Sequence, residues 1–304
     1  MPDRKHLEAY MRKMLFIYNP RSGKGVVGSK LSGIIEIFTK AGIDVIAHPT
    51  QSETDAKETA MRMAGEVDII TAAGGDGTLE EVAEGVYLSG KKVPIGIIPT
   101  GSTNDFASST EIPKDIIEAA NNIIEGVAED VDLGMFNDGH FIYIAAFGLF
   151  TDVSYTTDQN LKNVLGHAAY LIEAGKKLFN VPVYNMHVKS EEMEFSGKFA
   201  YGMITNGRSI GGIKDLAWKQ VDLSDGLFEV TLVKPPENIL VLSKIFEKLM
   251  SGEPSDYIIK FRTGRLEIEA EEDVAWTTDG ESAGTFKKVE IENISNAISF
   301  IVPN

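Results

Sequence analysis

The hydrophobic positions between Met14 and Pro99 form short apolar runs separated by stripes at helical spacing. Leu31, Ile34 and Phe38 give one such stripe, and Gly42 ends it. Short apolar strands that alternate with helices predict a mostly parallel sheet covered on both faces. We expect strands at residues 14–18, 43–48, 67–73 and 93–99, with helices at 31–38, 54–64 and 79–87.

The pattern changes from about Asp130, where several segments alternate apolar and polar residues as half-exposed antiparallel strands do. Two helices are expected among them, one within Asn160–Phe179 and one over Asn238–Met250. The chain therefore predicts an α/β unit followed by a mainly β unit, with a cleft between the two. The strands of the second unit are expected at residues 141–147, 183–189, 194–205, 227–233, 257–263, 265–270, 287–292 and 297–302.

Composition excludes several kinds of protein. The 304 residues suffice for two separate cores, and the absence of cysteine excludes disulfides and thiolate metal sites. A net charge of -16 argues against general binding to nucleic acid. The N-terminus shows no secretory signal, and the longest apolar run, Phe141–Phe150, is about half of the ~20 residues that span a bilayer. The five histidines lack the spacing of metal ligands.

The segment Gly74-Gly75-Asp76-Gly77-Thr78 joins the strand at 67–73 to a helix N-terminus. Its glycines let a bulky group approach the backbone, and the N–H groups at the start of a helix favour an anion such as phosphate. A carboxylate in the same turn is explained by a cation between Asp76 and the phosphate. The turn therefore predicts a site for a nucleotide with Mg2+.

Two further loops follow strands at the same predicted edge of the sheet, where ligands of parallel sheets bind. The run Asn19–Gly25 fails the P-loop pattern, because Tyr18 and Gly25 replace a required glycine and a required Ser or Thr. It is either a phosphate-contacting turn, with charge from Arg21 and Lys24, or an ordinary surface turn. The run Pro99–Ala107 either offers hydroxyl, amide and acid groups to a ligand or caps a helix through Asn104 or Asp105.

Two acidic loops lie in the second unit. Asp222 and Asp225 could bind one cation together with a backbone carbonyl, or could form an Asp-Gly hairpin turn. The turn Thr277–Glu281 carries Asp279 and Glu281, either of which could accept the proton of a hydroxyl in a kinase. The alternative there is a solvated acidic turn.

Together and in this order, these motifs resemble the diacylglycerol kinase catalytic-domain family, and specifically its soluble bacterial lipid kinases. The Gly-Gly-Asp-Gly-Thr signature is shared with NAD kinases and, more distantly, with phosphofructokinases, whereas the Gly101–Ala107 segment is typical of the lipid kinases. The matching segments span nearly the whole chain: Asn19-Pro20 with Ser22-Gly23, Gly74–Leu79, Gly101–Ala107, the Asp222/Asp225-Gly226 loop and Asp279-Gly280-Glu281.

The resemblance implies a three-layer α/β nucleotide-binding domain at residues 1–130 plus about 295–304, and a β-sandwich lipid-substrate domain at 131–294. It implies Glu281 as general base, Asp76 acting through Mg2+, and a second, structural Mg2+ held by Asp222, Asp225 and the carbonyl of Leu227. Glu80 stands where the family usually has Asn, and Ser102 replaces Thr. By matching position, ATP would contact Asn19, Pro20, Arg21, Ser22, Gly23, Thr50, Gly74, Gly75, Asp76, Gly77, Thr78, Leu79, Glu80 and Ser102.

The expected function is an ATP- and Mg2+-dependent kinase that converts diacylglycerol, or a related membrane lipid, to phosphatidic acid. We expect a cytoplasmic protein, peripheral to the inner face of the membrane, without a transmembrane segment and with a possible homodimer. The helix Asn238–Met250, with Lys244 and Lys248, either docks on the membrane or faces the core. The alternatives are an NAD kinase that uses the same nucleotide site and a non-catalytic nucleotide-binding protein.

Overall fold

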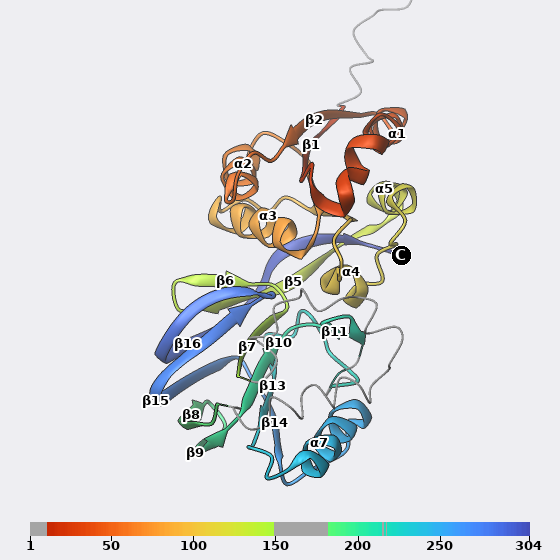
Figure 1. Cartoon of the computed structure of the whole chain (residues 1–304). Coiled ribbons are helices and arrows are strands. Elements are labelled where there is room, and N and C mark those ends of the chain that lie inside the picture. Colours follow the sequence, from red (N-terminus) through yellow and green to blue (C-terminus); the bar gives the residue numbers. More distant parts are fainter. Residues whose placement is uncertain (1–10, 149–181, 215, 217) are drawn as a thin grey trace, which may run out of the picture. The chain divides into compact units, whose positions relative to one another are not determined.

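A computed structural model describes residues 11–148, 182–214, 216 and 218–304 of the chain (Figure 1). Its backbone contacts divide into two compact units. Unit 1 holds the residues up to Asp132 together with Ser295–Asn304, and unit 2 holds Leu133–Ile294. The helix expected within Asn160–Phe179 lies outside the described residues.

Unit 1 is built on a parallel sheet whose strands follow the order β4-β3-β1-β2. All residues of the central strand β3 are buried, because helices cover both faces of the sheet. The last part of β16 (Glu281–Val302) pairs in parallel with β4, where Phe300 lies opposite Ile95. The strands of this sheet are β1 (Arg12–Tyr18), β2 (Ile43–Pro49), β3 (Ile69–Gly74) and β4 (Ile95–Pro99).

The helices of unit 1 form two layers, one on each face of the sheet (Figure 1). On one face α1 (Val26–Lys40) packs against α5 (Ile116–Glu125), and on the other α2 (Asp55–Met63) packs against α3 (Asp76–Leu88). The stripe of Ile34 and Phe38 on α1 is buried, as its spacing predicts. The short α4 (Asp105–Ser109) and the turn η1 (Ser22–Gly25) follow strand ends.

Unit 2 is a mainly antiparallel assembly. At its centre β10 pairs with β7 and β13, β15 pairs with β7, β8 and β16, and β14 pairs with β13. The strand β5 passes from unit 1 into unit 2 and pairs with β6. The strands not yet located are β5 (Val127–Phe136), β6 (Gly139–Phe141), β7 (Ile144–Gly148), β8 (Tyr184–Ser190), β9 (Glu194–Phe199), β10 (Tyr201–Thr205), β11 (Ser209–Ile210), β12 (Ile213–Lys214), β13 (Phe228–Val233), β14 (Ile258–Thr263) and β15 (Arg265–Thr278).

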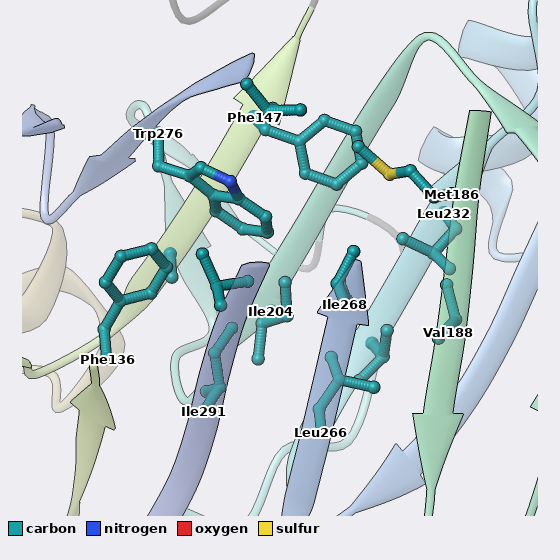
Figure 2. Close-up of a cluster of buried hydrophobic side chains, with 14 of the residues drawn as sticks. Phe136, Phe147, Met186, Val188, Ile204, Leu232, Leu266, Ile268, Trp276 and Ile291 are labelled. Atoms are coloured by element: carbon teal, nitrogen blue, oxygen red, sulfur yellow. The ribbon is translucent and has the colours of Figure 1, made fainter. Parts of the chain in front are cut away.

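An aromatic cluster forms the core of unit 2 (Figure 2). Trp276 is 2 % exposed, and the centre of its ring lies 4.8 Å from that of Phe147 and 5.2 Å from that of Phe136. Aliphatic side chains from β8, β10, β13 and β15 surround these rings. Burial of this much apolar surface stabilises the strands next to the two acidic loops of the second unit.

The predicted fold class is confirmed, but several strand boundaries are wrong. The strand expected at 194–205 is divided into β9 and β10, and that at 141–147 into β6 and β7. The strands expected at 287–292 and 297–302 are one continuous strand, β16. The helix expected at Asn238–Met250 is α7 (Ile239–Ser251), and Asn238 caps it by accepting hydrogen bonds from two backbone N–H groups.

Candidate functional site

In unit 1, backbone and side-chain hydrogen bonds join three loops that follow parallel strands. The N–H of Asn19 donates to the carbonyl of Ala73 (3.0 Å), and the N–H of Thr100 donates to the carbonyl of Gly74 (2.7 Å). The hydroxyl of Thr100 lies 2.9 Å from that of Ser22. The loops after β1, β3 and β4 therefore form one surface at the carboxyl edge of the sheet, where a ligand is expected.

Glycines make this close packing possible. A methyl group at Gly101 would lie 2.6 Å from the Cα atom of Gly75, which no real Cβ atom tolerates. A methyl group at Gly23 would lie 2.8 Å from the carbonyl oxygen of Thr100, and Gly23 also has a positive φ of 55°. Glycine is thus required at both positions.

Two carboxylates meet at this edge. Asp76 lies in the first turn of α3, and Asp105, which is 2 % exposed, lies in the first turn of α4. Burial raises the pKa of Asp76 to about 6, and the charge of Asp105 adds to the shift. Backbone N–H groups of residues 104–106 oppose it. Two close carboxylates in a desolvated place favour a bound cation.

This donor set fits Mg2+. The ion commonly takes one or two protein carboxylates and completes its octahedron with water and substrate phosphates. Among the described residues, no group of three or more His, Cys, Asp and Glu side chains could hold a metal, so the remaining ligands would have to come from elsewhere. Glycine-rich turns that expose N–H groups provide a place for the phosphates.

The alternative role of Asn104 as a helix cap is not what the structure shows. Asn104 occupies the N-cap position of α4, but its side chain makes no capping hydrogen bond. Its amide instead bonds to Gly101 twice, accepting from the N–H and donating to the carbonyl, both at 2.9 Å. The α4 N–H groups face Asp76, so one carboxylate links two helix N-termini.

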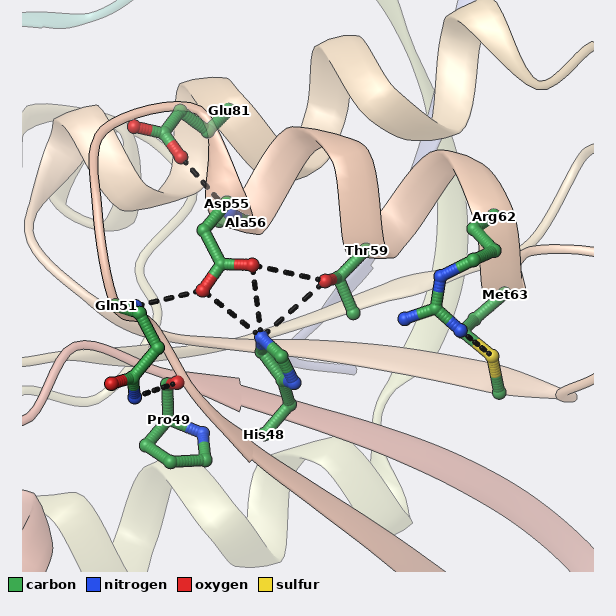
Figure 3. Close-up of polar contacts among 9 residues, drawn as sticks. All are labelled: His48, Pro49, Gln51, Asp55, Ala56, Thr59, Arg62, Met63 and Glu81. Carbon is green, nitrogen blue, oxygen red and sulfur yellow. Dashed lines mark hydrogen bonds and ion pairs between the residues drawn. The ribbon is translucent and has the colours of Figure 1, made fainter.

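Thr50 is half-buried and directly follows β2. A cluster of polar side chains joins the end of β2 to the start of α2, on either side of the loop that contains Thr50 (Figure 3). The Nε2 atom of His48 lies 3.1 Å from both carboxylate oxygens of Asp55 and 3.3 Å from the hydroxyl of Thr59. The N–H of Gln51 donates to Asp55 at 2.7 Å. Burial raises the pKa of Asp55, but the bonds from Gln51, His48 and Thr59 outweigh it and leave the pKa below its usual value.

The remaining predicted nucleotide contacts differ in exposure. Pro20, Arg21 and Ser102 are exposed, whereas the Leu79 side chain is 4 % exposed and belongs to the core. The side chains of Thr78 and Glu80 are half-buried. A small cavity beneath the loops is lined by Ala72, Gly74, Gly75, Asp76, Leu79, Ile97, Pro99, Asn104 and Ala107.

In unit 2, the loop before β13 forms Asx turns and no hairpin. Asp222 accepts hydrogen bonds from the N–H and hydroxyl of Ser224 (3.1 and 3.0 Å), and Asp225 accepts one from the N–H of Leu227 (3.0 Å). The other oxygen of Asp225 pairs with Arg262. Two carboxylates and a carbonyl are donors that Mg2+ takes, although Arg262 already supplies one positive charge.

Arg262 also binds a buried carboxylate. Its Nε atom lies 3.1 Å from Glu229, whose side chain is fully buried and whose second oxygen has no hydrogen-bond partner among the described residues. Burial raises the pKa of Glu229 to about 7, although the charge of Arg262 acts in the opposite direction. Sequence patterns did not single out this pair. A single Glu and a single Arg in strands that alternate apolar and polar residues resemble the many ion pairs found on protein surfaces.

Asp279 and Glu281 have different environments. The Asp279 side chain is 4 % exposed and accepts hydrogen bonds from backbone N–H groups, whereas Glu281, at the start of β16, is exposed. A solvated acidic turn therefore does not describe Asp279. Sequence reasoning also missed a role for Asp105 beside Asp76, although its place after Asn104 in a loop at the same sheet edge was a usable signal.

The helix α7 buries Leu242, Ile245 and Leu249, as a core-facing stripe does, and its Lys248 pairs with Glu253. Leu240 is 71 % exposed. Among the described residues, no helix combines the length and the apolar character needed to cross a bilayer.

Comparison with known proteins matches both units. Residues 13–136 match the model of the diacylglycerol kinase catalytic domain, and residues 145–301 match that of the YegS C-terminal NAD kinase beta sandwich-like domain. A diacylglycerol kinase of Bacillus subtilis (strain 168) is 32% identical over 300 residues, which cover 96% of this chain and 97% of the relative. A diacylglycerol kinase of Staphylococcus aureus (strain JH9) is 32% identical over 97% of this chain and 94% of its own.

A solved structure agrees with these matches. The crystal structure of a proposed diacylglycerol kinase from Bacillus anthracis str. Sterne has a TM-score of 0.80 and 27% sequence identity to this chain. The match covers 96% of this chain and 97% of the other. The matches to these relatives extend over nearly the full length of both chains and therefore include both units. The chain belongs to the diacylglycerol kinase family.

Proposed function

We propose that this lipid kinase transfers the γ-phosphoryl group of ATP to the free hydroxyl of diacylglycerol, giving phosphatidic acid and ADP. In the proposed step the hydroxyl oxygen forms a bond to the γ-phosphorus, and the bond from that phosphorus to the β–γ bridging oxygen breaks. The proton of the hydroxyl passes to the carboxylate of Glu281, which is exposed and therefore able to meet a substrate.

Asp76 and Asp105 would hold Mg2+, which would neutralise charge on the phosphates of ATP. The backbone N–H group of Gly23 and those of the turn at Gly74–Thr78 would bind the phosphate oxygens, with Thr50 and Ser102 as further contacts. Asp222, Asp225 and the carbonyl of Leu227 would hold a second Mg2+ that stabilises the loop before β13.

One observation gives the main support for a nucleotide and its metal ion at this site. A half-buried carboxylate, Asp76, and a buried one, Asp105, lie close together where glycine turns are packed too closely to admit a Cβ atom. Burying like charges is costly unless a cation compensates them. A nucleotide with its metal ion is the ligand that satisfies both the exposed N–H groups and the paired acids.

We propose further that the protein reaches its lipid from the cytoplasm, at the inner face of the membrane. Leu240 and Lys244 of α7 are exposed and could contact the bilayer, since one is apolar and the other cationic.

The test is a phosphorylation assay with labelled ATP and mixed micelles of diacylglycerol, ceramide or a polyprenyl alcohol, with NAD in a parallel reaction. Labelled phosphatidic acid is expected, and turnover should stop when Mg2+ is chelated. Phosphorylated NAD without any lipid product would support the NAD kinase alternative. ATP binding without turnover, unchanged by Glu281→Ala, would support a non-catalytic nucleotide-binding protein.

A further inference from the structure

The turn that carries Glu281 is a two-residue hairpin between β15 and β16. Thr278 pairs with Glu281, and the residues between them, Asp279 and Gly280, have positive φ values of 47° and 91°. Two successive positive φ values define the type I′ turn, for which Asp-Gly is a preferred sequence. Gly280 and Glu281 are exposed at the tip, but Asp279 is 4 % exposed.

The buried Asp279 fastens this turn to the segment between β6 and β7. One carboxylate oxygen accepts the N–H of Ile142 (2.6 Å), and the other accepts the N–H groups of Tyr143 and Ile144 (both 3.0 Å). The N–H of Asp279 donates to the carbonyl of Ile144 (2.9 Å), and the hydroxyl of Tyr143 donates to the carbonyl of Asp279 (3.1 Å). All of these groups belong to unit 2.

These bonds give Asp279 a different role from Glu281. Its oxygens already accept backbone N–H donors, and hydrogen bonds to an ionised acceptor are stronger than neutral ones. A carboxylate held in this way does not serve as the proton acceptor for a substrate. Its charge is used to fix the backbone two residues before Glu281.

The hairpin needs such an anchor. The register of β15 and β16 shifts between Trp276 and Thr277, just before the turn, and a bulge of this kind changes the direction of the strand end. A displacement of about 1 Å at a reacting group can cost about 10²-fold in rate. We propose that Asp279 is a positioning residue that holds Glu281 in the orientation needed for proton transfer; this inference rests on the proposed role of Glu281.

The test uses Asp279→Asn, Glu281→Gln and the double variant of the full chain, assayed with ATP and diacylglycerol micelles. Asn is nearly isosteric but turns one acceptor into an NH2 donor that faces backbone N–H groups. We expect kcat to fall about 10²-fold in Asp279→Asn, with KM for ATP changed less than about twofold. The double variant should be no slower than Glu281→Gln, because Asp279 acts only through Glu281.

Asn137 offers a matched control in the same unit. It also has a positive φ, of 50°, and its side-chain oxygen accepts the N–H of Glu290 at 2.9 Å. Asn137→Ala should lower the melting temperature as a lost turn contact does, while kcat stays at the wild-type value. If Asp279→Asn fails to fold, Tyr143→Phe removes the 3.1 Å bond to the carbonyl of Asp279 and should lower kcat about fivefold with KM for ATP unchanged.

The outcomes separate the two proposals. Full turnover of Asp279→Asn, or of a folded Tyr143→Phe if the first variant does not fold, overturns the positioning role. A double variant whose loss equals the product of the two single losses overturns it as well. Full turnover of Glu281→Gln contradicts the proposed base itself. A wild-type protein that phosphorylates only another lipid of the panel contradicts diacylglycerol as substrate, and the variants are then compared on that lipid.

Discussion

Asp76, which is half-buried, and Asp279, which is buried, both accept hydrogen bonds from backbone N–H groups, yet the charges around them differ. Asp76 has a second carboxylate, Asp105, beside it, and its pKa is raised to about 6. The carboxylate of Asp279 accepts hydrogen bonds from three backbone N–H groups. The first arrangement attracts a cation, and the second fixes a turn. Residue type alone therefore does not assign a role to an acid in this protein.

Asp76→Asn should abolish turnover while leaving the fold intact. The amide keeps the shape of the side chain and removes the charge that would hold Mg2+, so we expect kcat to fall by at least about 10²-fold. The melting temperature should be unchanged or higher, because repulsion from Asp105 is lost. Asp115→Asn is the control: Asp115 caps α5 in the same unit, and Asn is an equally good cap. Wild-type kcat in Asp76→Asn would contradict the proposed site.

At this scale the sequence predicts that the glycine turn with Asp76 joins a strand to a helix N-terminus, and the structure has this turn between β3 and α3. The contacts of these residues with a nucleotide and Mg2+ stay predictions. The sequence does not predict which hydrogen-bond partners a side chain will have. Asn104 sits in the N-cap position and bonds to Gly101 instead. Glu229 is fully buried beside Arg262, a pairing between different strands that no local pattern records.

Among the elements, the loops at the sheet edge depend on two glycines in direct contact. Gly101→Ala should weaken ATP binding and lower stability, because its methyl group would lie 2.6 Å from the Cα atom of Gly75. Gly33→Ala is the control: Gly33 lies inside α1 with nothing within 4 Å of a new Cβ atom, and the change should stabilise by about 0.5–1 kcal/mol. Titration with ATP and thermal unfolding test both. Equal ATP affinity in the two variants would contradict the role of Gly101.

The loop before β13 offers a test of the second metal site. Mg2+ should raise the melting temperature of the wild-type protein, and Asp222→Ala should reduce this increase, because a carboxylate ligand of one of the two proposed sites is lost. Ser224→Ala is the control, since it breaks a hydrogen bond to Asp222 without removing a carboxylate. The same Mg2+-dependent increase in wild type and in Asp222→Ala would contradict the assignment.

Element boundaries are predicted less well in unit 2 than in unit 1. In unit 1 three of the four strands end at a glycine or proline: β2 at Pro49, β3 at Gly74 and β4 at Pro99. In unit 2 the expected strand at 141–147 is broken at Ile142 and Tyr143, because their N–H groups bond to Asp279. The strand β16 continues through Asn296, where the pattern predicted a break. In the first case, hydrogen bonds between residues far apart in the sequence determined the boundary.

For the whole molecule, Glu229 makes stability depend on pH. Its pKa is about 7 in the folded state and 4.5 when unperturbed, so between these values the folded state holds a proton that the unfolded state has lost. The contribution of Glu229 to stability is therefore complete below about pH 4.5 and is lost as the pH rises through about 7.

Glu229→Gln should remove this dependence. The free energy of unfolding of the wild type should fall relative to that of Glu229→Gln as the pH rises from about 5 to about 8. Denaturant unfolding at several pH values measures the difference. A constant difference between the two proteins over this range would show that Glu229 does not titrate there.

The separation of Ser295–Asn304 from the rest of unit 1 in the sequence affects how the protein is made. Phe300 is fully buried, and its ring centre lies 4.4 Å from that of Phe106 in α4. A ribosome must synthesise all of unit 2 before it supplies this ring. During translation, β4 of the nascent α/β unit therefore lacks a neighbour on one side. The unit can complete its hydrophobic core only after residue 300 has left the exit tunnel.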